Sequence, residues 1–280
     1  MRKITLFLVA MMMSLTTMGQ KQLYILHTND THSTIYPLNP NLKDKKLAAR
    51  GGFLRRIAMV QEERKAHPDL LFFDSGDFSQ GSVYYTMFKG DVEINLMNEM
   101  GYDAACIGNH EFDFGIDNMA RLFRMARFPI LCANYDFRGT VLEGLVKPYI
   151  VIKRNGMRIG VFGLSPKLEG LVEMANCPGI VWKDPVAIAN EMVNVLKQKE
   201  KCDLVICLSH IGWDSNNGPN DQQVVAGTSG IDLVLGGHSH TYFDELRYVT
   251  DLSGRKVPVD QNGKHGIYVG QMIVEMQKNK

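Results

Sequence analysis

The segment Gly108–Gly115, which reads GNHEFDFG, places an amide, an imidazole and two carboxylates directly after an apolar run. The side-chain oxygen of Asn109 is a suitable metal ligand, whereas His110 can exchange a proton. Asp113 follows three residues later, close enough in a turn to fix the tautomer of His110 and stabilise its protonated form. Glu111 has a simpler interpretation as an exposed acid at a helix start, where the helix dipole favours negative charge. The segment therefore predicts a reactive site.

Metal-binding side chains also follow four other apolar segments. In HTNDTH, Asp30 and His32 stand two residues apart, and residues with this spacing share a side of an extended strand. Asp77 closes the segment DSGD, in which glycine lets the backbone approach an ion or a phosphate. The remaining imidazoles lie in CLSH and GGHSH and belong to His210, His238 and His240. Taken singly, each motif has a structural explanation, because DxH is frequent by chance, DSGD suits a helix cap and lone histidines are often structural.

The combination of these motifs is more informative than any one of them. Five apolar segments each end in side chains that can bind a metal, and the carboxyl ends of strands form the ligand site of open α/β sheets. The donors are Asp30, His32, Asp77, Asn109, His210, His238 and His240, which are too many for one ion. Nitrogen and oxygen donors without a thiolate suit two divalent ions of Mn, Zn, Fe or Co, bridged by one carboxylate. Such a pair activates water and favours phosphate ester hydrolysis.

Apolar strands and amphipathic helices alternate along the chain and must position these donors. We expect strands at Leu23–Leu26, Leu70–Phe73, Ala104–Ile107, Pro129–Ala133, Asp203–Leu208 and Ile231–Leu235. We expect helices at Phe53–Ala66 with its basic residues facing water, at Val92–Met100, at Gly115–Arg127, and from the N-cap Asp184 and Pro185 to about Lys201. An Asn155-Gly156 turn predicts an antiparallel hairpin. This order indicates an α/β domain in which most strands are parallel.

The first 20 residues have the features of a secretory signal peptide. Arg2 and Lys3 precede an apolar run from Ile4 to about Leu15, and a zone suited to cleavage follows. The run is shorter than the ~20 apolar residues that a spanning helix needs. We therefore expect residues 1–20 to be removed on export to the periplasm or the cell exterior. Residues 21–280 would form the catalytic domain, with no membrane span after signal removal.

Charge and cysteine content exclude other classes of protein. The net charge of +1 gives no basic field for a nucleic-acid backbone, so we expect no nucleic-acid partner. The five cysteines are odd in number and show no CxxC spacing. Neither a disulfide framework nor a structural zinc site is expected.

The series DTH, GD, GNHEFD, SH and GGHSH, in this order, resembles the calcineurin-like metallophosphoesterase superfamily. NDTH together with GNHEFDFG is similar in particular to the 5′-nucleotidase family, and the resemblance extends from Leu23 to about Met272. It implies a four-layer α/β/β/α sandwich with a mixed sheet core. It also implies a hydrolase that uses two divalent metal ions to convert 5′-nucleotides, as small-molecule phosphate esters, to nucleoside and phosphate.

The resemblance implies a role for each donor. One ion would be held by Asp30, His32, Asp77 and His240, and the other by Asp77, Asn109, His210 and His238, with Asp77 as the bridge. His110 would stabilise the phosphoryl transition state and assist the leaving oxygen, with Asp113 as its partner. Asn109 and His110 would contact the substrate phosphate. Many nucleotidases have glutamine at the position of His240, and this departure leaves a competent donor.

Members of that family typically continue, after a strand such as HGIYVGQMIVEM, into a second domain that grips the nucleoside, whereas this sequence ends at Lys280. No residue corresponds to the nucleoside clamp, so the nucleoside-binding residues are unknown. The catalytic half would act alone with broad specificity or with a separate chain that carries a nucleoside-binding domain. Two alternatives stay open. The chain could be a phosphodiesterase or pyrophosphatase for cyclic nucleotides or nucleotide sugars, or a non-catalytic, metal-loaded binding subunit.

Overall fold

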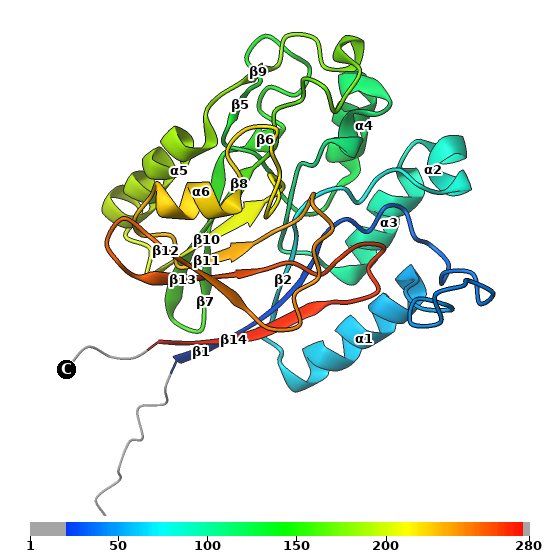
Figure 1. Ribbon diagram of the computed structural model, residues 1–280, viewed down its shortest axis with the longest axis horizontal. Coiled ribbons are helices and arrows are strands. Elements are labelled where there is room, and N and C mark those ends of the chain that lie inside the picture. Colours follow the sequence, from blue (N-terminus) through cyan, green and yellow to red (C-terminus); the bar gives the residue numbers. More distant parts are fainter. Residues whose placement is uncertain (1–20, 277–280) are drawn as a thin grey trace, which may run out of the picture.

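Two central sheets with helices on their outer faces make up the described part of the chain (Figure 1). The structure is a computed structural model that describes residues 21–276. The expected signal peptide, residues 1–20, therefore lies outside the described residues. Within residues 21–276, no helix combines the length and the hydrophobicity that crossing a membrane requires.

The first sheet is mainly parallel. Its strands, in spatial order, are β14 (Gly270–Met276), β1 (Lys21–Thr28), β2 (Leu71–Asp74), β3 (Ala104–Cys106), β4 (Ile130–Leu131) and β6 (Val146–Lys147). β14 alone runs antiparallel to its neighbour, and the other pairs are parallel. The carboxyl ends of β1, β2 and β3 consequently lie at the same edge of the sheet.

The second sheet is mixed. Its strands, in spatial order, are β12 (Arg247–Thr250), β13 (Lys256–Asp260), β11 (Leu233–Leu235), β10 (Leu204–Ser209), β8 (Met157–Leu164) and β7 (Tyr149–Arg154). The four inner strands are parallel, whereas β12 and β7 are antiparallel edge strands. A small separate sheet pairs β5 (Tyr135–Asp136) with β9 (Val181–Trp182).

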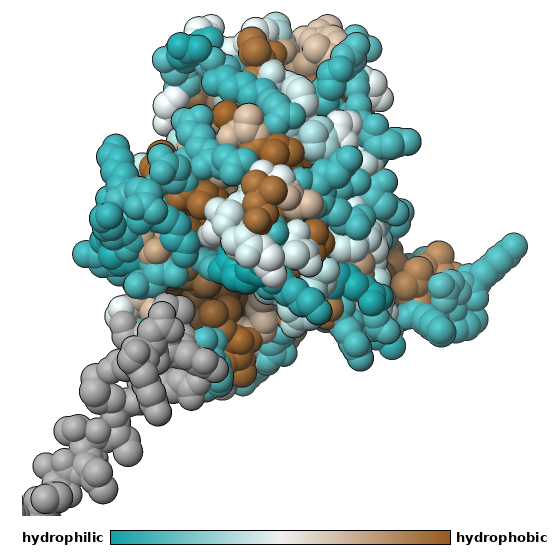
Figure 2. Space-filling view, turned by 60° about the vertical axis from the view of Figure 1, so that its left-hand side comes forward, coloured by the Kyte–Doolittle hydropathy of each residue, from teal (hydrophilic) through white to brown (hydrophobic). Residues whose placement is uncertain are grey.

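Helices cover the outer face of each sheet. The described α-helices are α1 (Phe53–Ala66), α2 (Val83–Phe88), α3 (Asp91–Met100), α4 (Gly115–Met125), α5 (Pro185–Asn194) and α6 (Asp221–Ala226). Short 3-10 turns lie at His110–Phe112 and Met174–Asn176, and a π-helical turn at Val195–Lys199 extends α5. Figure 1 shows α1, α3 and α4 beside the first sheet and α5 and α6 beside the second. On the face that carries α5, α6 and the β12–β13 hairpin, hydrophilic side chains predominate (Figure 2).

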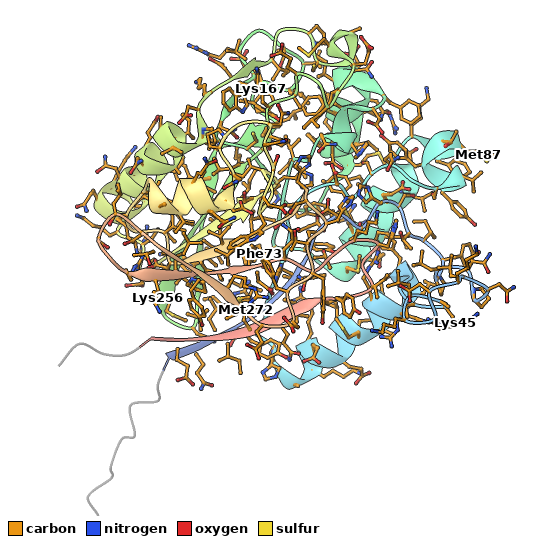
Figure 3. The ribbon with its side chains drawn as sticks, in the orientation of Figure 1. Lys45, Phe73, Met87, Lys167, Lys256 and Met272 are labelled. Atoms are coloured by element: carbon orange, nitrogen blue, oxygen red, sulfur yellow. The ribbon has the colours of Figure 1, made fainter. Side chains whose placement is uncertain are left out.

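Alternation along the strands divides the core into three apolar layers. On β1, Leu23 and Ile25 point between the two sheets, whereas Tyr24 and Leu26 point toward the helices. Phe73 lies in the layer between the sheets, near the centre of the molecule (Figure 3). A third layer packs the second sheet against α5 and α6. Because both faces of the central strands are buried, their sequences are continuously apolar. The expected four-layer α/β/β/α sandwich is confirmed.

Local sequence signals predict several elements correctly. Asn155 and Gly156 both adopt positive φ, of 49° and 68°, as the expected hairpin turn between β7 and β8 requires. The Asp184 side chain accepts a hydrogen bond from the N–H of Ala187 at 2.8 Å, which confirms the helix cap before Pro185. The five cysteines are buried and free.

One expectation about the helices is wrong in part. The basic residues of α1 are expected to face solvent, but Arg56 is only 3% exposed. Its guanidinium packs over the ring of Phe53 and donates hydrogen bonds to the carbonyl oxygens of His265 and Gly266, shortly before β14. The helix after Asp184 continues beyond Asn194 as a π-helical turn to Lys199, close to its expected end at about Lys201. The short helix α2 and the small β5–β9 sheet were not expected.

Candidate metal centre

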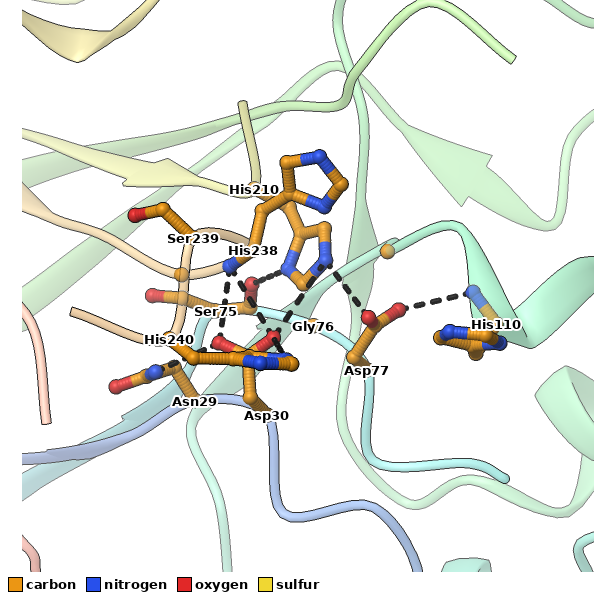
Figure 4. Close-up of polar contacts among 12 residues, drawn as sticks. Asn29, Asp30, Ser75, Gly76, Asp77, His110, His210, His238, Ser239 and His240 are labelled. Carbon is orange, nitrogen blue, oxygen red and sulfur yellow. Dashed lines mark hydrogen bonds and ion pairs between the residues drawn. The ribbon is translucent and has the colours of Figure 1, made fainter. Parts of the chain in front are cut away.

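All the segments expected to carry metal ligands meet at one place. The loops after β1, β2 and β3 of the first sheet converge there with the loops after β10 and β11 of the second (Figure 4). The side chains lie on both sides of a shared edge, since the two sheets present the carboxyl ends of their parallel strands in the same direction. Elements far apart in the sequence thus contribute to a single cluster.

A first group of donors comprises Asp30, His32 and His240, whose ligand atoms all lie within 4.8 Å of one another. The Nε2 atoms of His240 and His32 lie 3.4 Å and 3.8 Å from Oδ1 of Asp30. The two Nε2 atoms are 2.9 Å apart. Two imidazole nitrogens and a carboxylate oxygen therefore point toward one position.

A second group comprises Asp77, His210 and His238, again with ligand atoms within 4.8 Å of one another. Nε2 of His210 lies 3.1 Å from Oδ2 of Asp77 and 3.9 Å from Oδ1 of Asp30. Asp30 and Asp77 are fully buried, as is His210. The two groups are therefore adjacent, and the surrounding protein shields Asp30, Asp77 and His210 from solvent.

The backbone at the strand ends aims these side chains inward. Asp30, His32, Asp77, His238 and His240 all have positive φ, between 43° and 69°. The N–H of Asp30 donates to the carbonyl oxygen of Gly76, and that of His32 to the carbonyl oxygen of Asp77, at 2.9 Å and 3.0 Å. The left-handed conformation of these residues turns the backbone sharply after each strand. The turns after β1 and β2 consequently support each other.

Polar neighbours orient individual donors. Nδ1 of His210 lies 2.6 Å from the carbonyl oxygen of Ser75. The side chain of Asn29 and the N–H of His238 donate to Oδ2 of Asp30, at 2.6 Å and 2.9 Å. These contacts leave Oδ1 of Asp30 as the atom nearest to the imidazoles. Hydrogen bonds from outside a metal site commonly fix ligands in this way.

Glu111 is not the exposed acid that the sequence indicated. Its side chain is 2% exposed, and its carboxylate accepts hydrogen bonds from the N–H groups of Asp77, Ser79 and Gly108 at 3.0 Å, 3.1 Å and 2.7 Å. Burial, and then the charge of Asp77, raise the pKa of Glu111 to about 7. The residue therefore fastens the loop after β2 to the loop after β3, and sequence pattern carried no signal for that contact.

Several buried polar atoms of the cluster lack a partner among residues 21–276. Those with a lone pair available for a cation include Oδ1 of Asn109 and Nε2 of His210, the latter of which is in ion-pair contact but has no hydrogen bond. Buried polar atoms without partners are costly unless something else binds them. Lone pairs on imidazole nitrogens and an amide oxygen suit a cation, so the residues present fit divalent metal ions.

The charges of the centre favour a cation as well. Burial lowers the pKa of His210, but the carboxylates of Asp77 and Asp30 outweigh burial and raise it to about 10. Burial alone would raise the pKa of Asp77, and His210 instead holds it far below its ordinary value. Burial, followed by the charge of His210, lowers the pKa of His238 to about 4. The carboxylates therefore attract positive charge, while His238 stays neutral and able to act as a ligand.

His110 and Asp113 form a pair at the rim of the centre. Nδ1 of His110 lies 3.1 Å and 3.2 Å from the two carboxylate oxygens of Asp113. The backbone N–H of His110 donates to Oδ1 of Asp77 at 2.9 Å, and its ring centroid is 5.4 Å from that of His32. Burial lowers the pKa of His110, but the hydrogen bond with Asp113 outweighs it and raises the pKa. Both side chains are about one-third exposed, so a substrate can reach them.

His265 also lies beside the centre, although it belongs to none of the motifs described above. Its backbone N–H donates to the carbonyl oxygen of Asp30 at 2.7 Å, and its ring centroid is 6.0 Å from that of His32. It belongs to the loop that precedes β14 rather than to a segment following a parallel strand. Only the antiparallel return of β14 beside β1 brings it to this edge.

Comparisons with known proteins agree with the fold and the motifs. The chain matches the calcineurin-like phosphoesterase family over residues 23–242. It is 33% identical to human 5′-nucleotidase over an alignment of 281 positions, which covers 93% of this chain and 47% of that protein. The structure of the 5′-nucleotidase precursor from Thermus thermophilus superimposes with a TM-score of 0.82 at 30% identity, over 90% of this chain and 51% of that one.

A structure described as calcineurin-like phosphoesterase YfkN from Bacillus subtilis superimposes with a TM-score of 0.77 at 27% identity, over 93% of this chain and 87% of that one. The chain spans about half the length of the curated 5′-nucleotidases that it matches. The matched range 23–242 contains every strand end that contributes to the two donor groups. This chain belongs to the calcineurin-like phosphoesterase family.

Proposed function

We propose that the chain is a dinuclear metal-dependent hydrolase of phosphate esters, with 5′-nucleotides as its favoured substrates. The observation that carries this proposal is the pair of adjacent donor groups, each with a carboxylate and two imidazoles within 4.8 Å. Asp77 would bridge the two ions. Asp30, His32, Asp77 and His240 would hold one ion, and Asp77, Asn109, His210 and His238 the other. The mixed nitrogen and oxygen donors suit Mn, Zn, Co or Fe.

Two bound ions would supply an activated water and neutralise charge on the phosphoryl oxygens. The protein would supply the remaining catalytic groups. His110 would donate a hydrogen bond or a proton to the departing ester oxygen, and the carboxylate of Asp113 would keep its ring oriented and protonated. The contact of 3.1 Å between Nδ1 of His110 and Asp113 supports this division of roles. Asn109 and His110 would contact the substrate phosphate.

Nucleotides are the favoured substrates because the similar proteins are named as nucleotidases or nucleotide phosphoesterases. Human and rat 5′-nucleotidase are 33% and 35% identical to this chain, and a Bacillus subtilis relative named trifunctional nucleotide phosphoesterase is 29% identical. This chain spans about half the length of those 5′-nucleotidases. We propose that a separate chain with a nucleoside-binding domain supplies nucleoside-binding residues.

Hydrolysis assays test the proposal. The purified chain, loaded with Mn, is expected to release phosphate from AMP, and a panel of other 5′-nucleotides would give its base preference. Cleavage of bis-p-nitrophenyl phosphate, cyclic nucleotides or nucleotide sugars without release of phosphate from AMP would instead identify a phosphodiesterase or pyrophosphatase. Intact substrates with several metals would favour a non-catalytic binding subunit, unless a partner chain restores turnover.

Export is proposed from the first 20 residues. Their charged start and apolar run are typical of a signal peptide. Amino-terminal sequencing of protein recovered from the periplasm or the culture medium is expected to begin near residue 21. Full-length protein retained in the cytoplasm would contradict export without affecting the proposed chemistry.

A further inference from the structure

Three arginines line one cavity behind the loop that precedes β14. The cavity has a volume of about 470 Å³ and is lined by Arg50, Gly51, Arg55, Arg56, Met59, Gly266, Ile267, Tyr268 and Val269. It lies between the start of α1 and residues 266–269, on the side of the molecule where the loop bearing Lys45 projects (Figure 3). None of its lining residues is acidic, and none belongs to the proposed metal ligands.

Arg56 is the buried member of this set. It is 3% exposed, and its Nη1 donates to the carbonyl oxygens of His265 and Gly266, at 3.2 Å each. Its guanidinium carbon lies 4.1 Å from the centroid of the Phe53 ring. Nε and Nη2 have no hydrogen-bond partner within residues 21–276. A buried cation that retains two free donors is expensive unless an anion accompanies it.

Two exposed arginines add to the positive charge of Arg56, on which the carboxylate of Asp74 acts without a direct ion pair. Arg50 and Arg55 are exposed at the cavity, and across the described part of the chain neither they nor Arg56 form an ion pair with a carboxylate. The 14-residue helix α1 begins at Phe53 with no acidic residue in its first turn and no side-chain cap. Its amino-terminal dipole therefore adds to the positive potential.

We propose that this cavity is a second anion site, separate from the metal centre, and that it binds a phosphate group. The planar, multiply donating guanidinium matches the oxygens of a phosphate, and three of them can share its two negative charges. The volume of about 470 Å³ leaves room for an organic part attached to the phosphate. Tyr268, whose ring stacks on that of Tyr242 at 4.2 Å, offers that part an aromatic wall.

One loop separates the cavity from the metal centre. Arg56 holds the carbonyl oxygens of His265 and Gly266 from the cavity side, while the N–H of His265 donates to the carbonyl oxygen of Asp30 at 2.7 Å. An anion at Arg56 would thus lie behind the backbone that supports Asp30. No proposed metal ligand lines the cavity, so binding there does not depend on the metals or on turnover.

Isothermal titration calorimetry of the full chain with inorganic phosphate tests this proposal. Metal-loaded protein is expected to bind phosphate both at the cavity and at the metal centre. After the metals are removed with a chelator, only phosphate binding at the cavity is expected to remain. Phosphate binding that persists after chelation supports the proposal, whereas complete loss of phosphate binding overturns it. The measurement detects binding without hydrolysis, so its result is independent of the proposed phosphoesterase activity.

Two double variants test whether phosphate binds at this cavity. Because a substitution of buried Arg56 can prevent folding, the test uses the exposed pair Arg50→Gln with Arg55→Gln, checked by circular dichroism. The matched control, Arg124→Gln with Arg127→Gln, removes the same charge from exposed positions at the end of α4. We expect the cavity pair to weaken phosphate binding at least ~10-fold and the control pair to leave it unchanged. Equal affinities in the two variants would overturn the proposal.

Two further probes identify the source of the phosphate. AMP binding more tightly than inorganic phosphate to the chelated protein, with adenosine failing to bind, indicates a phosphorylated organic molecule. Equal affinities for AMP and inorganic phosphate indicate free phosphate as the ligand. Adenosine binding as tightly as AMP would show that the phosphate contributes nothing, and would contradict the proposal.

Discussion

Nδ1 of His210 donates a hydrogen bond to the main-chain oxygen of Ser75 over 2.6 Å. Because a carbonyl oxygen can only accept, this contact places a proton on Nδ1. Nε2, which lies 3.1 Å from Oδ2 of Asp77, is left as the atom that can bind a second proton or a cation. The loop after β2 therefore sets the ring orientation before any ion binds, which lowers the cost of assembling the centre.

Removal of His210 should empty one of the two proposed metal positions. We expect His210→Ala to reduce the Mn content from about two ions to about one per chain and to lower turnover at least ~100-fold. Mass spectrometry of the metals in gel-filtered protein, with phosphate release from AMP, measures both effects. His67→Ala is the control, since His67 stacks on Tyr24 at 3.8 Å and takes no part in the centre. Full metal content and activity in His210→Ala would contradict the assignment.

The His110–Asp113 pair should act on turnover rather than on metal binding. We expect His110→Gln to retain both ions and to lose ~100-fold or more in kcat, because the leaving oxygen loses its donor. Asp113→Asn should cost less than His110→Gln, since it disturbs only the orientation and protonation of the ring. The matched control is Asp117→Asn, at an exposed position in the first turn of α4. Unchanged rates in His110→Gln would remove its proposed role.

Glu111 should contribute mainly to stability. Glu111→Ala leaves three buried N–H groups without an acceptor, so we expect the free energy of unfolding to fall by at least ~3 kcal/mol. Urea denaturation of the metal-free protein measures this loss. Glu62→Ala, at a side chain that is 71% exposed, should change stability by no more than ~0.5 kcal/mol. Similar midpoints for the two variants would mean that the loops after β2 and β3 hold together without Glu111.

Asp221 should make stability depend on pH. It is 1% exposed and accepts a hydrogen bond from Ser209, and burial raises its pKa from 3.8 to about 7. Because the folded protein then binds this proton more tightly than the unfolded chain does, the free energy of unfolding falls as pH rises from about 4 to about 7. Above that range the loss is complete, and its size is ~4 kcal/mol at most.

Asp221→Asn isolates this effect because asparagine keeps the acceptor for Ser209 and never ionises. We expect the variant to resemble the wild type at pH ~5 and to be more stable at pH ~8, since no buried charge forms. Asp74 and Glu111, whose pKa values burial also raises to about 7, are present in both proteins and cancel in the comparison. An identical pH dependence in the two proteins would show that Asp221 does not titrate in this range.

Strands, turns and most helices could be predicted from sequence because their signals are local. The Asn155-Gly156 turn and the Asp184-Pro185 cap depend on the conformations of one or two residues, and both are where the pattern places them. The division into two sheets could not be derived from the residues alone. Leu23 and Tyr24 are both buried, one between the sheets and one under helices, and hydrophobicity does not distinguish these environments.

The segments bearing the candidate site could be identified because its donors follow strands in recognisable motifs. Their grouping into two sets, and their roles, came from the family resemblance, and the roles of individual ligands remain predictions. Glu111, Arg56 and His265 could not be assigned from sequence. Each acts through the backbone of a segment far away in the chain, and such contacts leave no periodic or compositional signal.

The left-handed backbone at the strand ends places stability and activity in opposition. Asp30, His32, Asp77, His238 and His240 occupy a region that costs side-chain-bearing residues roughly 1 kcal/mol each, and glycine would relieve that strain at every one of these positions. Selection for thermal stability alone would therefore favour glycines that erase the donors. Engineering for heat resistance should leave these five positions untouched and seek its gains in the helical layers, away from the shared edge of the sheets.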